Sequence, residues 1–196
     1  MELVLVRHGL PIRLARDDGA PADPPLSDEG WQQADAVGRW LERESFDAVY
    51  VSPMQRARQT AEPYLDRAGL EPRVESRVAE FDRDADQYVP MEELKRTDYE
   101  TWRQLVQGGY EAAPNFAAFQ RDAVQALADI AERHPGDRVL VVCHGGVINV
   151  WAGAVIGIGP RLFFEPGYTS INRFRVARSG ERSVSSLNEL AHLILG

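Results

Sequence analysis

Two short apolar runs, each ending in a histidine and a glycine, constrain this chain more than any other feature of its sequence. Residues 3–9 read LVLVRHG and residues 139–146 read VLVVCHGG. A continuous aliphatic run of this length is typical of a parallel strand that is buried on both faces. Because ligands bind beyond the carboxyl ends of such strands, two neighbouring strands would bring His8 and His144 to one site.

The segments between these runs alternate between strand and helix patterns, which indicates an α/β fold with a mostly parallel sheet. Ser27 begins a predicted helix as its N-cap, and two acidic residues follow it at the positive end of the helix dipole. We also expect strands at residues 47–51, 73–75, 170–176 and 183–187, and helices at residues 52–69, 115–134 and 147–156.

The second predicted strand leads into a helix whose first turn is a candidate anion site. Ser52 is expected as the N-cap of this helix, with Pro53 at the first helical position. The free amides and the partial positive charge of a helix N-terminus attract phosphate groups. Arg56 and Arg58 are two positions apart and point in different directions, so at most one of them reaches this site. We choose Arg56 because it is closer to the helix N-terminus.

The length and charge of the chain limit its organisation and its partners. We predict one domain over residues 1–196, a length that can bury a sizeable core. The net charge of −8 argues against a nucleic-acid or membrane partner, since either requires a basic face. Cys143 is the one cysteine, so no internal disulfide forms, and we expect it to be a buried spacer. Without a signal-like or membrane-spanning segment, we expect a cytoplasmic location. The oligomeric state is left open.

Two segments have no sustained pattern and are expected at the mouth of the site. Residues 10–26 are rich in proline and glycine, and their Arg13 and Arg16 either contact substrate or face solvent. Residues 81–115 are predicted to form a lid-like insertion, with short helices at residues 91–95 and 100–106.

The acidic residues at the start of the second segment are interpreted as a solvated surface, because runs of charge usually face water. They are Asp82, Asp84 and Asp86.

Three motifs, in this order, resemble those of the histidine phosphatase superfamily, which has a phosphoglycerate-mutase-like fold. They are Leu-Val-Arg-His-Gly at residues 5–9, Ser-Pro-x-x-Arg-Ala-x-Gln-Thr-Ala at residues 52–61, and Val-x-His-Gly-Gly at residues 142–146. The resemblance extends from residue 3 to about residue 193. It implies a three-layer αβα sandwich with a mostly parallel central sheet and an inserted lid.

The resemblance also implies a role for each matching residue. His8 would be the nucleophile that forms a phosphohistidine, and Glu80 would be the proton donor. The phosphate pocket would consist of Arg7, His8, Arg56, His144 and Gly145. The implied activity is a metal-independent phosphomonoesterase that needs no cofactor and acts on a small phosphorylated metabolite.

This division of labour is chemically reasonable. Two guanidinium groups can bind the non-bridging oxygens of a phosphoryl group and stabilise its charge in the transition state. A neutral imidazole is a competent nucleophile near pH 7, and a carboxyl group with a raised pKa can protonate the leaving group. Arg7 and His8 are consecutive, so both reach one pocket only if the chain leaves the extended conformation here, which Gly9 would allow.

The sequence departs from the mutases of this superfamily beside both motifs. Leu10-Pro11-Ile12-Arg13 follows the first motif where the mutases carry Glu-Ser, and Phe81-Asp82-Arg83 follows Glu80 in place of a Gly-x-x-Glu-Gly pattern. These differences favour phosphatase activity over mutase activity. Leu10 and Pro11 would suit a leaving group with an apolar part.

Several alternatives remain open from the sequence. Within the superfamily, they are a phosphoglycerate mutase-type phosphotransferase and a phosphoprotein phosphatase. Outside it, the chain could be a non-catalytic module that binds a phosphorylated ligand. A metal hydrolase built on His8, Glu80 and His144 is a further alternative, although Arg7 and Arg56 would repel a cation.

Overall fold

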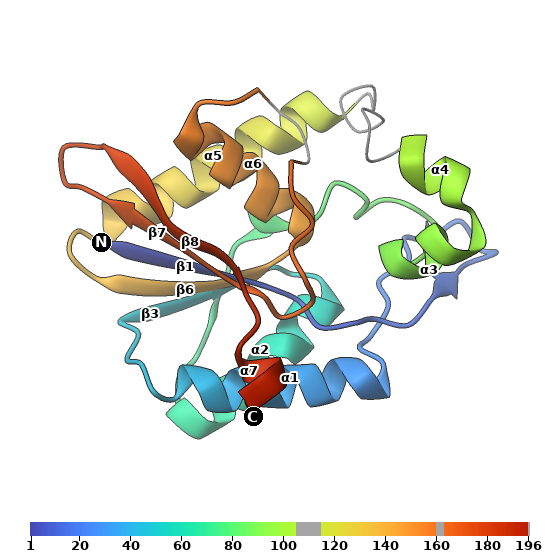
Figure 1. Cartoon of the computed structure of the whole chain (residues 1–196), viewed down its shortest axis with the longest axis horizontal. Helices are drawn as coiled ribbons and strands as arrows, with labels where there is room; N and C mark the ends of the chain where they lie inside the picture. The colour runs from blue at the N-terminus through green and yellow to red at the C-terminus, as the bar shows by residue number, and fades with distance from the viewer. Residues whose placement is uncertain (105–114, 160–162, 196) are drawn as a thin grey trace.

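The computed structural model describes residues 1–104, 115–159 and 163–195 and shows a sheet between two layers of helices (Figure 1). The sheet has six strands in the order β4-β3-β6-β1-β7-β8. β4, β3, β6 and β1 are parallel, whereas β7, towards one edge of the sheet, pairs antiparallel with both β1 and β8. The strands are β1 Glu2–Arg7, β3 Ala48–Val51, β4 Arg73–Val74, β6 Arg138–Cys143, β7 Ile171–Val176 and β8 Arg182–Glu189.

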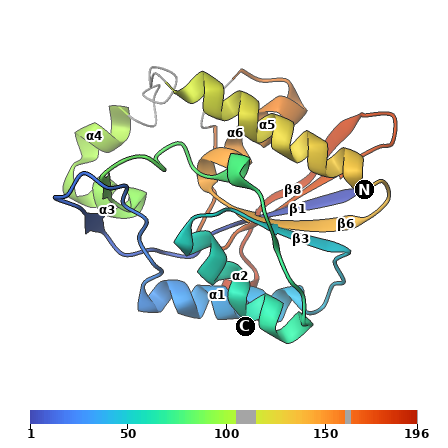
Figure 2. The same cartoon turned by 180° about the vertical axis from the view of Figure 1, so that it is seen from behind.

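Helices cover both faces of this sheet (Figures 1 and 2). On one face lie α1 Asp28–Leu41 and α2 Gln55–Ala68, with the short α7 His192–Leu195 beside α1. On the other face lie α5 Phe116–Arg133 and α6 Gly145–Ile156. The expected three-layer αβα sandwich with a mostly parallel sheet is therefore confirmed.

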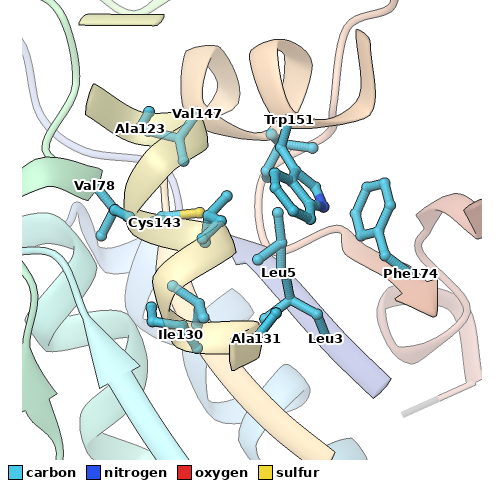
Figure 3. Close-up of a cluster of buried hydrophobic side chains, with 14 of the residues drawn as sticks. Leu3, Leu5, Val78, Ala123, Ile130, Ala131, Cys143, Val147, Trp151 and Phe174 are labelled. Atoms are coloured by element: carbon cyan, nitrogen blue, oxygen red, sulfur yellow. The ribbon is translucent and has the colours of Figure 1, made fainter. Parts of the chain in front are cut away.

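The buried residues of β1 explain why its sequence is apolar at each of residues 3–6. Leu3 and Leu5 belong to the core under α5 and α6, which Figure 3 shows around Cys143 and Trp151. The alternate residues of β1, valines at positions 4 and 6, belong to the separate core under α1 and α2. Successive side chains of a strand point to opposite faces, so a strand between two helical layers must be apolar on both.

Local signals in the sequence set several element ends as expected. The hydroxyl of Ser27 accepts a hydrogen bond from the Gly30 amide at the start of α1. Gly69 ends α2 in the left-handed conformation, with a φ of 63°. β7 and β8, the two strands predicted at residues 170–176 and 183–187, form a hairpin, and Gly180 in its turn has a φ of 101°. No helix within the described ranges is both long and apolar enough to pass through a membrane.

The insertion predicted at residues 81–115 is described as far as residue 104 and again at residue 115. Its β5 (Gln87–Tyr88) pairs with β2 (Leu14–Ala15) of the proline-rich loop, so the two irregular segments contact each other. α3 Met91–Thr97 and α4 Tyr99–Gln104 follow at the end of the molecule opposite the N-terminus (Figure 1). Both predicted short helices are present, but the expected end of the second at residue 106 lies outside the described residues.

Candidate active site

The pairing of β1 with β6 brings the two histidines together. Arg7 aligns with Cys143 in this parallel pair, and the backbone amide of His8 donates to the Cys143 carbonyl at 2.9 Å. The rings of His8 and His144 lie 5.1 Å apart, centroid to centroid, and both side chains are buried. His8 lines a cavity of about 240 Å³, whereas His144 is fully buried beside it and does not line that cavity.

The side chains of Arg7 and His8 both line this cavity although the residues are consecutive. β1 ends at Arg7, and beyond His8 the Gly9 amide donates to the hydroxyl of Thr60 at 2.9 Å. Gly9 does not have a positive φ. It has to be glycine for lack of space, because a Cβ atom would lie 2.7 Å from the Gly30 carbonyl oxygen of α1. The lack of a side chain at Gly9 therefore permits a close approach between the loop after β1 and the first turn of α1.

The ring of His8 is held in one orientation and one tautomer. Its Nδ1 atom lies 2.8 Å from the Gly9 carbonyl oxygen. A carbonyl oxygen only accepts hydrogen bonds, so Nδ1 carries the proton and Nε2 carries the lone pair. Burial, followed by the positive charges of Arg56 and Arg7, lowers the pKa of His8 well below its ordinary value. His8 is consequently a neutral imidazole with a free lone pair.

The two arginines supply buried positive charge next to His8. Arg56, from the first turn of α2, is fully buried, and Arg7 is nearly so. The Nε atoms of both side chains and Nη1 of Arg56 have no hydrogen-bond partner among the described residues. Leaving a buried charged donor without a partner costs free energy, so these atoms are suited to the oxygens of an anion. Arg58 faces solvent, as expected.

Ser52 does not cap α2, contrary to the expectation. α2 begins at Gln55 after Met54, whose side chain makes no capping hydrogen bond, and the Gln55 amide donates to the carboxylate of Asp23 at 3.0 Å. The Ser52 hydroxyl instead lies 2.7 Å from Nε2 of His144. The Nδ1 atom of His144 has no partner within the described chain, and burial, with the charge of Arg56, lowers the pKa of this histidine well below its ordinary value. A hydroxyl beside a buried imidazole satisfies one ring nitrogen, which the local cap pattern could not reveal.

The carboxylate of Glu80 lies in the cavity and is held by two backbone amides. It accepts hydrogen bonds from Gly146 at 2.8 Å and from Phe81 at 3.1 Å. Glycine at position 146 leaves room for this carboxylate, since a Cβ atom there would overlap it in its present position. Burial, with the negative charge of Asp82, raises the pKa of Glu80 to about 7. Glu80 can therefore hold a proton near neutral pH, as an acid catalyst must.

Asp82 is part of this site, so its interpretation as a solvated surface residue was wrong. Its carboxylate lies 3.2 Å from Nη2 of Arg56, and its side chain lines the cavity. Burial raises the pKa of Asp82, and the charge of Arg56 opposes this shift. Asp84 and Asp86 are exposed, as expected. The local charge pattern of these three aspartates could not show that the side chain of Asp82 points inward, towards an arginine from another segment.

Two tyrosines complete the surroundings of the arginines, and the sequence pattern identified neither. The ring of Tyr168 lies 3.9 Å from the guanidinium of Arg7, and that of Tyr88 lies 4.7 Å from Arg56. Glu92 of α3 accepts a hydrogen bond from the Tyr168 hydroxyl at 2.7 Å and lies 3.8 Å from Nη1 of Arg7. The described part of the insertion thus contacts both arginines of the site.

The remaining candidates divide into one that lies in the cavity and several that do not. Gly145, at the start of α6, lines the cavity next to Arg7. Arg13 pairs with Glu93, and Arg16 pairs with an aspartate of its own loop, so neither lines the cavity. The cavity is also not lined by Leu10 or Pro11. Its apolar surface comes from other segments of the chain.

The described residues contain no group of three or more histidine, cysteine, aspartate or glutamate side chains arranged to hold a metal ion. Cys143 is buried in the core under α6, where burial raises the pKa of its thiol. It is a spacer between the strand and His144, as expected.

Comparison with known proteins adds a family match and three similar proteins. Residues 3–189 match the family model of the histidine phosphatase superfamily, branch 1. Phosphoserine phosphatase 1 of Hydrogenobacter thermophilus is 26% identical over 98% of this chain and 94% of its own length. The probable phosphoglycerate mutase GpmB of Erwinia tasmaniensis is 26% identical over 81% of this chain and 76% of its own length. The solved structure of Bacillus stearothermophilus YhfR, 27% identical over 98% of both chains, superimposes with a TM-score of 0.76.

Proposed function

The chain belongs to the histidine phosphatase superfamily, and we propose that it hydrolyses phosphomonoesters of small metabolites through a phosphohistidine on His8. The family match and the phosphoserine phosphatase relative together support a phosphatase that acts on small phosphorylated metabolites. The observation that carries the mechanism is the surroundings of His8. Unpartnered, buried nitrogen atoms of Arg7, Arg56 and His144 lie around an imidazole whose Nε2 atom has a free lone pair.

In the first step, the Nε2 lone pair of His8 attacks phosphorus, and the bond from phosphorus to the ester oxygen breaks. The two guanidinium groups stabilise the charge that is spread over the three non-bridging oxygens in the transition state. The protonated carboxyl group of Glu80 gives its proton to the departing alkoxide, so the alcohol leaves neutral.

In the second step, the carboxylate of Glu80 removes a proton from water, whose oxygen attacks the phosphohistidine. The N–P bond then breaks, which releases inorganic phosphate and restores the His8 lone pair. The charge that a metal ion supplies in other phosphatases would come here from Arg7 and Arg56. We therefore expect the same turnover before and after dialysis against a strong chelator, and a lasting loss that added Mg²⁺ or Zn²⁺ reverses would contradict this part.

The test of the mechanism is to detect the phosphoenzyme. We expect brief mixing with a ³²P-labelled phosphomonoester to give a label on the protein that is lost in acid and retained in alkali. His8→Ala should abolish both the label and the release of inorganic phosphate.

The matched control is His134→Gln. His134 is a buried histidine that contacts Tyr50 and Asp137 and does not line the cavity. This variant should label and turn over as the original protein does. Full turnover by His8→Ala, or a label on another residue, would exclude the mechanism.

A mutase reaction is the second candidate because one relative is a probable phosphoglycerate mutase. In a mutase, phospho-His8 would transfer its phosphoryl group to a hydroxyl of the bound product before water reacts. Incubation with 3-phosphoglycerate separates the two outcomes. We expect release of inorganic phosphate or no reaction, and formation of 2-phosphoglycerate would instead support the mutase.

A further inference from the structure

The cavity has a charged end and an apolar end. The charged end contains His8, Arg7 and Arg56, whose positive charges act on the His8 ring. The rest of its wall is formed mainly by aliphatic and aromatic side chains from three separate parts of the chain. They are Phe81, Val89, Met91, Phe116, Phe163 and Phe164.

The aromatic pair at the apolar end is fixed in position by a buried polar side chain of α6. The rings of Phe163 and Phe164 lie 4.9 Å apart. The side-chain oxygen of Asn149 accepts hydrogen bonds from the amides of both residues, at 3.1 and 3.4 Å. Its side-chain nitrogen donates to the carbonyls of Phe164 and Gly145, at 3.1 and 3.0 Å. All of the hydrogen-bonding groups of Asn149 thus hold this wall, and they are not available to a substrate.

The charges at the apolar end do not suit an anionic leaving group. Among the described residues that line the cavity, Arg7 and Arg56 are the cations, and both belong to the phosphate end. The acidic lining residues are Glu80, Asp82 and Glu165. Among the described lining residues, a substrate carboxylate would therefore meet negative charge and apolar surface, with no cation beyond the two arginines of the phosphate end, and this burial would cost free energy.

From this arrangement we propose that the apolar end binds the organic part of the substrate, so that the preferred substrates are phosphomonoesters of apolar alkyl or aryl alcohols. The inference rests on the proposed function, because the phosphoryl group must be bound between the arginines and His8. A cavity of about 150 Å³ with apolar walls accommodates benzene in an engineered protein. The cavity of about 240 Å³ here has space for a phosphoryl group together with several carbon atoms.

The test compares substrates whose leaving groups are all primary alcohols, so that the chemistry of the leaving group varies little. They are methyl, butyl, hexyl and 2-phenylethyl phosphate, with phosphoserine as the charged member. We expect kcat/KM to rise about fourfold for each methylene that enters the cavity, the factor expected for full transfer out of water. Phosphoserine should be hydrolysed no better than methyl phosphate.

Variants of the apolar wall give the second arm of the test. Phe164→Ala should lower kcat/KM for hexyl phosphate about tenfold or more and leave methyl phosphate unchanged, because methyl phosphate reaches only the charged end. The matched control is Ile156→Ala, an exposed apolar residue at the end of α6, which should change neither value. Val89→Lys places a cation in the wall and should raise the turnover of phosphoserine relative to hexyl phosphate.

The outcomes separate this inference from the proposed function. Hydrolysis of phosphoserine faster than of hexyl phosphate would overturn the inference and leave the phosphatase intact. A value of kcat/KM that does not change with chain length would do the same. No hydrolysis of any ester, with a correctly folded protein, would overturn both.

Discussion

At the scale of single residues, the chemistry of this site depends on which groups are charged. His8 and His144 are kept neutral by burial and by the arginines, which lower the pKa of both rings. Glu80 is pushed in the opposite sense, because burial and the charge of Asp82 raise its pKa. A neutral nucleophile and a protonated acid can therefore exist together in one cavity at pH values at which free carboxyl groups are ionised.

The first prediction concerns the dependence of activity on pH. Since the pKa of Glu80 is about 7, kcat/KM should be level below that pH and should fall tenfold per pH unit above it. Glu80→Gln should lower kcat about 100-fold or more and remove the fall. Asp82→Asn removes the negative charge that helps to raise the pKa of Glu80, so the fall should move to lower pH. An unchanged profile in both variants would show that another group titrates.

At the scale of elements, the site is assembled where the end of β1 meets the start of α1. The first turn of α1 approaches the loop after β1 so closely that neither Gly9 nor Gly30 can carry a side chain. A Cβ atom on Gly30 would overlap the Leu10 carbonyl oxygen, which belongs to the backbone and cannot rotate away. Two hydrogen bonds also stabilise this close approach: the amide and the hydroxyl of Ser27 both donate to the Leu10 carbonyl at 2.9 Å.

The second prediction tests this close approach. Gly30→Ala should destabilise the protein by about 1–3 kcal/mol, since relief of the overlap requires movement of the backbone. The control is Gly153→Ala in α6, where the nearest atom to the new Cβ would be at an ordinary contact distance of 3.6 Å. This variant should stabilise the protein by up to about 1 kcal/mol, because alanine favours a helix. Urea unfolding measures both, and equal effects of the two substitutions would contradict the argument.

At the scale of the whole molecule, folding buries several ionisable side chains and favours their uncharged forms. Three buried histidines have a lowered pKa: His8, His144 and His192, which has a pKa of about 4 because of burial. The unfolded chain takes up protons on these histidines as the pH falls below about 6.5, whereas the folded chain does not. Glu80 and Asp82 act in the opposite sense, since their pKa values are raised in the folded state.

The third prediction follows from this balance. More histidines than carboxyl groups are involved, so the free energy of unfolding should decrease by about 1–2 kcal/mol per pH unit between about pH 6.5 and pH 4.5. His192→Gln should reduce this dependence by about 1 kcal/mol per pH unit, because one uncharged buried histidine is removed. Urea unfolding of both proteins across this pH range is the measurement. Greater stability at pH 5 than at pH 7 would contradict the prediction.

Several parts of the site could be predicted because their signals are local. The apolar run before His8, and its counterpart before His144, marks two strands with both faces buried, and β1 and β6 are adjacent as expected. The choice of Arg56 over Arg58 used the angle between helix positions and the nearness of Arg56 to the helix N-terminus, and Arg56 lines the cavity. Ser52 and Asp82 were misinterpreted, because each contacts a side chain from a distant segment and a local pattern contains no information about that partner.

By itself, the sequence determined the layers of this protein, since continuous apolar strands between amphipathic helices can be buried in few other ways. It also determined which strand ends carry the histidines, through the abrupt end of each apolar run. Only the tertiary structure decided the protonation state of these groups and the apolar nature of the cavity wall. Both depend on desolvation and on charges that are brought together from distant segments, as Glu80, Asp82 and Arg56 are here. Such contacts exist only after the chain has folded, because no spacing along the chain encodes how close two segments come.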